Sequence, residues 1–257
     1  MADSVQLETT SHDLAPLRVL QTSSYEQIAQ IQMDAMRAHA ARLGRPLAIL
    51  EAGCGQRWNV DLTGIAYTLT GVDLDAAAIE LRIQRMHDLD FAIVGDLCTL
   101  ELPKASFDVV FSSFVLEHVP RADVALANMI ASLRPGGLFI LRVPERESAR
   151  AFFTRVLPHP AHVWFYRYVY GRRQAGKPGH APYPTYFHPV MGRRCLAQFL
   201  AQHGVKSVTA YGDGFRRDGS GIISLILHGF MKLTAILSLG RLTADYCDVL
   251  YVARKDA

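Results

Sequence analysis

Small and acidic residues follow three apolar stretches of the sequence, and together they could bind a nucleoside. Gly53 and Gly55 come just after the first stretch, where glycines permit a tight turn and a close approach of the backbone to a ligand. Asp73 follows the second stretch, and a carboxylate there can accept both hydroxyls of a ribose. Asp96 follows the third and could meet an adenine amino group. Either acid alone would more simply cap the next helix, but the three positions in register predict a nucleoside site.

The elements that must position these residues alternate between strands and helices. Apolar runs predict strands over residues 47–50, 68–72, 91–94, 107–111, 138–143, 206–211 and 246–253, and helical periodicity predicts helices over 24–43, 75–86, 123–133 and 193–203. Ser24 is the expected cap of the first helix. Because the strands are uniformly apolar and are separated by helices, they indicate a parallel, doubly wound α/β sheet with helices on both faces.

The composition is that of a folded protein. The chain has 257 residues, of which half are apolar and 20% are charged, and this excludes a disordered protein. The four cysteines form no Cys-x-x-Cys pair, so they predict reduced, mostly buried thiols and not a zinc site or a disulfide framework. The first twenty residues contain no apolar run, and no apolar stretch reaches the length of an ordinary membrane span. We therefore expect a cytoplasmic protein.

The charge is unevenly distributed along the chain. Residues 148–212 contain nine Arg and Lys and no Asp or Glu, whereas the rest of the chain has 18 basic against 24 acidic residues. An acidic body with one basic insertion favours an anionic substrate.

The sequence between Leu47 and Val143 resembles the class I S-adenosylmethionine-dependent methyltransferases of the type 11 group. Five segments occur in the order of that family: 51–55, 71–75, 95–97, 107–110 leading to 116–119, and 133–137. The resemblance implies a Rossmann-like sheet of seven strands, mostly parallel, whose last strand (246–253) is antiparallel, together with lid insertions. It also implies S-adenosyl-L-methionine as the cofactor and S-adenosyl-L-homocysteine as its product.

The same resemblance assigns a set of cofactor-binding residues. Gly53 and Gly55 would lie alongside the methionine part of the cofactor, Asp73 would hold the ribose and Leu74 would flank the adenine. The full set is Glu51, Gly53, Gly55, Asp73, Leu74, Asp96, Leu97, Ser112 and Ser113. The chain departs from the family where a third glycine is usual, because residues 56–58 are Gln-Arg-Trp, and residues 59–64 are a poor helix sequence. This side of the pocket is therefore expected to have a different shape.

His118 is the candidate catalytic base, because it follows the fourth strand and a hydroxyl acceptor benefits from a base near neutrality. Its alternative role is packing at the start of a helix. Ubiquinone-type O-methyltransferases have an additional acid for a metal where this chain has Phe114, so we predict no metal. The Asn/Asp-Pro-Pro-aromatic tetrad of enzymes that methylate nucleic-acid amino groups is absent, which argues against DNA as the acceptor.

We expect one methyltransferase domain over residues 1–257, with two insertions. The N-terminal cap helix (24–43) precedes a cofactor-binding core (45–144), an acceptor lid (145–190), the rest of the core (191–211 and 244–257) and an apolar insertion (212–243). In the lid, aromatic and cationic side chains could bind an anionic acceptor, namely Trp164, Arg167, Tyr183, Tyr186 and His188. An aromatic lid core with a solvated basic rim is the alternative.

The apolar insertion has three interpretations. Residues 222–239 could form a buried helical pair, a homodimer face, or a peripheral membrane contact. In the last case a short helical hairpin turning near Gly229 would return the chain to the side of the membrane that it left. Taken together, the sequence predicts O-methylation of a small anionic or amphipathic molecule such as a glycolipid, a sugar or a polyketide-like compound, by a cytoplasmic or membrane-associated enzyme. Two alternatives stay open: an RNA or protein methyltransferase, with RNA disfavoured because no RNA-binding module is recognisable, and a non-catalytic S-adenosylmethionine-binding regulatory or scaffold protein.

Overall fold

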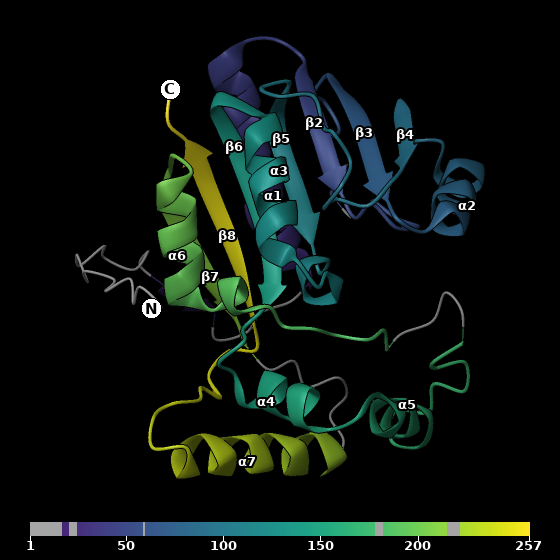
Figure 1. The fold of residues 1–257 in the computed structure, drawn as a ribbon, viewed down its shortest axis with the longest axis vertical. Coiled ribbons are helices and arrows are strands. Elements are labelled where there is room, and N and C mark those ends of the chain that lie inside the picture. Colours follow the sequence, from purple (N-terminus) through teal and green to yellow (C-terminus); the bar gives the residue numbers. More distant parts are fainter. Residues whose placement is uncertain (1–16, 21–24, 59, 178–181, 215–221) are drawn as a thin grey trace, which may run out of the picture.

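The computed structural model describes residues 17–20, 25–58, 60–177, 182–214 and 222–257 (Figure 1). Its described strands form one eight-stranded sheet in the order β1-β7-β8-β6-β5-β2-β3-β4. Strand β8 is antiparallel to both of its neighbours, β6 and β7, and every other pair is parallel. The strands are β1 (Leu17–Leu20), β2 (Leu47–Ala52), β3 (Tyr67–Asp73), β4 (Phe91–Val94), β5 (Phe107–Ser113), β6 (Leu133–Pro144), β7 (Val205–Asp213) and β8 (Asp248–Lys255).

The sheet contains the seven expected strands, and its last strand is antiparallel as predicted. Strand β1 adds an eighth by pairing with the outer edge of β7. Strand β6 begins at Leu133, five residues before the predicted start, because Leu133 pairs with Phe107 before the register shifts and Leu138 pairs with Val109. The predicted strand therefore misses this irregular first part of β6.

Helices cover both faces of the sheet, as predicted. On one face α1 (Tyr25–Leu43) contributes Ile28 and Met36 to an apolar core with Ile49. Ser24, its expected cap, lies outside the described residues. On the other face α3 (Ala122–Ser132) and α6 (Arg193–Gln202) pack against strands β5 to β8. Helix α2 (Ala76–Met86) follows β3, and the Asp75 carboxylate caps it by accepting from the amides of residues 77 and 78.

Three helices form a separate layer beyond the carboxyl ends of the parallel strands (Figure 1). We call α4 (Ala149–Val156), α5 (His159–Tyr168) and α7 (Ile222–Leu237) the helical lobe. Helix α7 continues through Gly229, so the turn expected there is not formed, and it packs on α4 with the Phe153 and Phe230 rings 5.0 Å apart. Among the described residues, no helix combines the length and the apolar character needed to cross a membrane.

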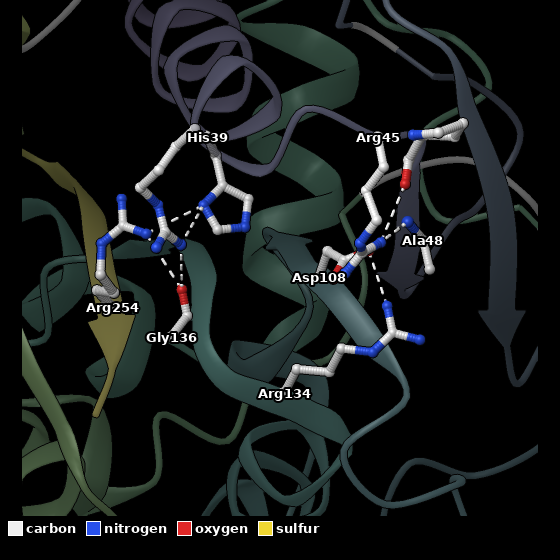
Figure 2. A network of polar contacts seen from close by, with 9 residues as sticks. His39, Arg45, Ala48, Asp108, Arg134, Gly136 and Arg254 are labelled. Atoms are coloured by element: carbon white, nitrogen blue, oxygen red, sulfur yellow. Dashed lines mark hydrogen bonds and ion pairs between the residues drawn. The ribbon is translucent and has the colours of Figure 1, made fainter. Parts of the chain in front are cut away.

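The opposite edge of the sheet, where the parallel strands begin, carries a charge cluster around the buried Asp108 (Figure 2). The Asp108 carboxylate, at the start of β5, accepts two hydrogen bonds from the Arg45 guanidinium at 2.6 and 2.8 Å and one from the Ala48 amide at 2.9 Å. Arg134 forms a further ion pair with it at 2.8 Å. Although burial opposes ionisation, these donors lower the pKa of Asp108 to about 2. The cluster therefore joins the first residues of three strands.

A histidine lies beside this cluster and stays neutral (Figure 2). Nδ1 of His39, on α1, lies 3.0 Å from the Arg254 guanidinium and 3.3 Å from that of Arg42. Both arginines also donate to the Gly136 carbonyl. Burial and the two cations lower the pKa of His39 to about 4, so its Nδ1 acts as an acceptor. This edge of the sheet is held by charge pairs and faces away from the loops that follow the strands.

Candidate functional site

The candidate site begins with a tight glycine turn after β2. Gly53 has a φ of +77°, and a Cβ at this position would collide with a methyl carbon of Val115. The amides of Gly53 and Cys54 both donate to the Val72 carbonyl, at 2.8 and 3.0 Å. Only glycine satisfies both the left-handed backbone and the close approach. The turn therefore brings the end of β2 against the end of β3.

Asp73 is joined directly to this turn. Its carboxylate accepts hydrogen bonds from the Gly55 amide at 2.7 Å and from the Asp75 amide at 2.9 Å. The helix that follows is capped by Asp75, so Asp73 itself does not cap it. A carboxylate oxygen can accept more than one hydrogen bond, and Asp73 is only half-buried. It can therefore take two ribose hydroxyls while it still holds the turn.

The residues after β3 and β4 lie beside Asp73. The Gly95 amide donates to the Asp73 carbonyl at 2.9 Å, which aligns the two strand ends. Leu74 is 72% exposed, so its side chain is available to an apolar ligand surface. The Asp96 carboxylate is exposed and accepts from the Cys98 amide at 2.8 Å, whereas the Leu97 side chain is buried in the core. The structure thus brings the Gly53–Gly55 turn, Asp73 and Asp96 to one edge of the sheet.

Glu51 makes an ion pair inside the protein that the sequence did not indicate. Its carboxylate lies 2.6 Å from the guanidinium of Arg82, a fully buried residue of α2. Arg82 also donates to the Cys54 carbonyl at 2.7 Å and pairs with Asp88 at 3.1 Å. Arg82 was missed because an arginine in an amphipathic helix usually faces solvent. Its hydrogen bond to the Cys54 carbonyl holds the glycine turn in place.

The end of β5 provides an unpaired hydroxyl. The Ser112 Oγ is buried and has no hydrogen-bond partner among the described residues, and Ser113 next to it is half-buried. Phe114 then adopts a φ of +57°, and its ring lies under the Arg142 guanidinium at 4.5 Å. A buried orphan hydroxyl is costly unless a ligand pairs with it. Ser112 therefore points to a polar ligand group at this strand end.

His118 lies on the short helix η1 (Leu116–His118), directly beyond β5. Its Nδ1 is 2.7 Å from the Pro184 carbonyl. A carbonyl can only accept, so Nδ1 carries the proton and Nε2 has the lone pair. Burial lowers the pKa of His118, against the opposing effect of the Pro184 carbonyl. The neutral imidazole with a free Nε2 is the form that a general base requires.

Glu117 is a second titratable group beside His118. Its Oε1 lies 3.9 Å from the His118 Nε2, and its Oε2 is buried with no hydrogen-bond partner among the described residues. Burial raises the pKa of Glu117 to about 8. The carboxyl is therefore protonated at neutral pH and can donate a hydrogen bond. Sequence reasoning passed over Glu117, although its place next to His118 was a usable signal.

A segment of the acceptor lid lies against η1. In this crossing segment (residues 182–187), the Tyr186 amide donates to the Glu117 carbonyl at 2.7 Å. The Tyr183 ring meets the His118 ring edge-on, with centroids 5.7 Å apart. Burial and the nearby Asp75 and Asp73 raise the pKa of Tyr183. Tyr183 thus contacts the imidazole and is close enough to the acids at the end of β3 to feel their charge.

Arg150, on α4, is a cation that sequence reasoning did not select. Its guanidinium lies 3.9 Å from the Asp248 carboxylate, and half of its side chain is exposed. The Glu117 carboxyl and the hydroxyls of Tyr166 and Tyr170 lie close enough to interact with it electrostatically. Arg150 is therefore surrounded by lid and site residues while it keeps access to solvent.

The structure uses the other predicted lid residues differently. The Arg167 guanidinium donates to the Ala175 carbonyl at 2.9 Å, which holds the chain after α5. His188 caps the short helix η2 (Pro189–Met191) and lies 3.7 Å from Asp123. Trp164 is exposed on α5, with its ring 5.7 Å from that of Tyr168. These three are not brought together with His118 by any described contact, whereas Tyr183 contacts the His118 ring and Tyr186 bonds to the neighbouring Glu117 carbonyl.

The altered sequence after Gly55 has a visible consequence. No helix forms in residues 53–58 and 60–66, between β2 and β3. Val60 and Leu62 are buried there, and the Trp58 ring packs edge-on against Phe111 at 5.1 Å. The missing helix is thus replaced by an irregular loop with its own apolar contacts.

Cysteines and metal ligands add nothing to the site. Cys54 and Cys247 are buried as predicted, Cys98 is half-buried, and Cys195 is exposed, contrary to the expectation for most thiols. Within the part of the chain that the structure describes, no three His, Cys, Asp or Glu side chains are grouped so that they could hold a metal ion.

Comparison with known proteins agrees with this geometry. Residues 50–141 match a family model described as a methyltransferase domain. The chain is 36% identical over 99 residues to a probable S-adenosylmethionine-dependent methyltransferase of Mycolicibacterium smegmatis, with 38% of each chain covered. It is 27% identical over 173 residues to the ubiquinone biosynthesis O-methyltransferase of Nitrosococcus oceani, with 62% of this chain and 65% of the relative covered. The chain thus spans 38% and 65% of the lengths of these two relatives.

A solved structure shares the fold. The phosphoethanolamine N-methyltransferase 2 of Haemonchus contortus, in complex with S-adenosyl-L-methionine, superposes with a TM-score of 0.50 over 87% of this chain and 52% of that chain. The sequence identity is 17%, so this likeness concerns the fold alone.

Proposed function

We propose that this chain, whose residues 50–141 match a methyltransferase domain model, is a class I methyltransferase that transfers the methyl group of S-adenosylmethionine to an oxygen of a small anionic or amphipathic molecule. The observation that carries the proposal is the contact between the glycine turn and Asp73, with the Gly55 amide 2.7 Å from the carboxylate. This contact joins the glycine turn, where the backbone can approach a ligand closely, to the carboxylate that can accept a ribose. His118 lies beyond the end of β5, the strand next to β2.

The residues present fit S-adenosylmethionine. Gly53 permits the tight turn and Gly55 has open space for the methionine part, Asp73 has acceptor capacity for the ribose, and the exposed Leu74 offers an apolar surface to the adenine. The orphan hydroxyl of Ser112 would gain a partner. When bound, the cofactor supplies a methyl group on a positively charged sulfur, so transfer requires chiefly an in-line approach by a nucleophile.

His118 removes the proton of the acceptor hydroxyl in this proposal. Its Nε2 is the unprotonated nitrogen, because Nδ1 is held by the Pro184 carbonyl. Tyr183 and the crossing segment lie against the imidazole and limit the access of water. The protonated Glu117 carboxyl, 3.9 Å from Nε2, can donate a hydrogen bond to the acceptor and orient it.

Arg150 supports an anionic acceptor. Its guanidinium is half-exposed next to Asp248, Tyr166 and Tyr170, and a guanidinium pairs with carboxylate or phosphate by two parallel hydrogen bonds. The lid tyrosines provide an apolar wall beside this charge. We therefore propose an acceptor that has a hydroxyl near His118 and an anionic group near Arg150.

The first test is a melting-temperature shift with S-adenosylhomocysteine. A ligand at 100 times its Kd stabilises the fold by about 2.7 kcal/mol. We expect a clear shift in the wild type and in Asp34→Ala, a control carboxylate exposed on α1, and none in Asp73→Ala. No shift in the wild type, or an unchanged shift in Asp73→Ala, would remove the nucleoside site from this sheet edge.

The second test measures transfer of labelled methyl groups. Hydroxylated carboxylates and phosphates are compared with their neutral esters, in the wild type, in Arg150→Gln and in Arg155→Gln, an exposed control on the same helix. We expect Arg150→Gln to raise KM for the anionic acceptors by about tenfold or more and Arg155→Gln to leave it unchanged. Equal use of neutral esters would refute the anionic acceptor. Label removed by nuclease or protease would indicate RNA or protein, and cofactor binding without any transfer would indicate a scaffold.

A further inference from the structure

Helix α7 presents one side to solvent at the end of the molecule farthest from the sheet (Figure 1). Six large apolar residues lie on that side and are each between 51% and 72% exposed. Their spacing follows the helical period, so they form a continuous row. We call them the apolar row: Leu225, Ile226, Phe230, Leu233, Ile236 and Leu237.

The opposite side of α7 already has a partner. The residues between members of the row, such as Leu227, Met231 and Ala235, are half-buried. Helix α4 packs against α7, and its Phe153 ring lies 5.0 Å from that of Phe230, the member of the row that is least exposed at 51%. The apolar row is therefore the side of α7 that is left facing solvent, because the other side packs on the protein. Contiguous apolar surface of this kind on a folded chain marks a site of interaction.

The charges within the helical lobe have a single sign, and the exposed acids Glu147 and Asp245 lie just outside it. The sequence of the lobe and its flanks, residues 149–177 and 222–244, contains eight Arg and Lys and no Asp or Glu. Two of them, Lys232 and Arg241, lie on α7 or just after it and are exposed, and Arg172, Arg173 and Lys177 are exposed after α5. A second copy of this chain would bring equal charges together, whereas an anionic surface would be attracted.

We propose that the apolar row docks this protein on an anionic lipid surface. An amphipathic helix lying in the interface buries its apolar side at the boundary of headgroups and acyl chains, and nearby cations pair with acidic headgroups. The inference is independent of the methyl transfer proposed above, because α7 contributes none of the residues of that site.

The test is co-sedimentation of the full chain with vesicles. One set consists of phosphatidylcholine alone, and the other of equal amounts of phosphatidylcholine and phosphatidylglycerol. We expect binding to the anionic vesicles, weakened at high salt, and about tenfold or more loss of binding in Leu233→Glu. Phe91→Glu, an exposed apolar residue of β4 outside the lobe, is the matched control and should bind as the wild type does. Thermal unfolding verifies that both variants fold.

Three results would overturn the proposal. The first is a wild type that sediments with neither vesicle, and the second is equal binding of the wild type and Leu233→Glu. The third is a dimer by light scattering that Leu233→Glu converts to monomer without any vesicle binding, since the row would then be an interface between copies of this chain. Catalytic assays without lipid are unaffected by any of these results, so failure here is distinguishable from failure of the methyltransferase proposal.

Discussion

Replacing Glu117 by Gln should stabilise the protein at neutral pH, although Glu117 belongs to the candidate site. Its carboxyl is buried, and Oε2 has no hydrogen-bond partner among the described residues. Burial raises the pKa to about 8 from an ordinary value of 4.5. The folded protein therefore keeps the proton at pH 7, whereas the unfolded chain releases it. Folding at neutral pH must take up a proton, and this uptake lowers the free energy of unfolding.

The size of the effect follows from the two pKa values. Below pH 4.5 the group is protonated in both states and costs nothing. Between pH 4.5 and pH 8 the cost grows by about 1.4 kcal/mol per pH unit, so it reaches about 3 kcal/mol at pH 7. Glutamine has a similar shape and does not titrate. For a chain of this size, the difference corresponds to a melting temperature roughly 10 °C higher for Glu117→Gln at pH 7.

The assay is thermal and denaturant unfolding of the wild type and Glu117→Gln from pH 4.5 to 8. The stability difference should widen with rising pH by about 3 kcal/mol up to pH 7, while Glu101→Gln, an exposed carboxyl, should show no such trend. If the stability difference between Glu117→Gln and the wild type stays constant with pH, the buried protonated carboxyl is refuted. It is also refuted if that difference shrinks between pH 4.5 and pH 7.

Three further outcomes are expected. Gly53→Ala should abolish the melting shift with S-adenosylhomocysteine and lower the stability by more than the roughly 1–2 kcal/mol of left-handed strain, because its Cβ would meet Val115. Gly44→Ala, also at positive φ but with open space around it, should lower the stability by the strain alone. Equal losses of stability in differential scanning fluorimetry would contradict this. The stability difference between the wild type and His39→Gln should shift by about 3 kcal/mol against the wild type as the pH drops from 6.5 to 4, since the pKa of His39 is lowered to about 4 and only the unfolded wild type takes up this proton. Urea unfolding of both proteins at those pH values measures the shift, and a difference that does not change with pH would contradict it. His118→Gln should lower kcat by 10²- to 10⁴-fold while the S-adenosylhomocysteine shift persists. Wild-type kcat should rise with pH through a pKa below 6.5 and fall again near pH 8, where Glu117 releases its proton.

The parallel sheet and the edge that carries the site could be predicted because their cause is local in the sequence. Ile49 and Val110 lie in runs that are apolar throughout, and both are fully buried, as expected for strands covered on two faces. Once the strands are parallel, the residues after them must meet at one edge, which places Gly53, Asp73 and Asp96 together. Residue type and order were therefore sufficient for this part.

The remaining contacts depend on distant parts of the chain. Arg82 reads as a surface residue of an amphipathic helix, yet it is fully buried because Glu51, Asp88 and the Cys54 carbonyl together satisfy its guanidinium. Such a set of partners has no signature in the spacing of residues. Arg150 was likewise hidden within a segment that lacks regular alternation, and its position depends on how α4 packs beyond the sheet.

The hydrogen bond from His118 to the Pro184 carbonyl ties the proton position on the imidazole to the position of the crossing segment. While that carbonyl is in place, the lone pair is on Nε2. If the segment moved away, the proton would no longer be held on Nδ1. A fraction of the molecules would then carry it on Nε2, the nitrogen that must accept the proton of the acceptor hydroxyl. An acceptor that settles against Tyr183 and holds the segment closed would therefore also set the tautomer needed for its own deprotonation. Readiness for reaction and occupancy of the acceptor site would then be coupled through a single main-chain oxygen.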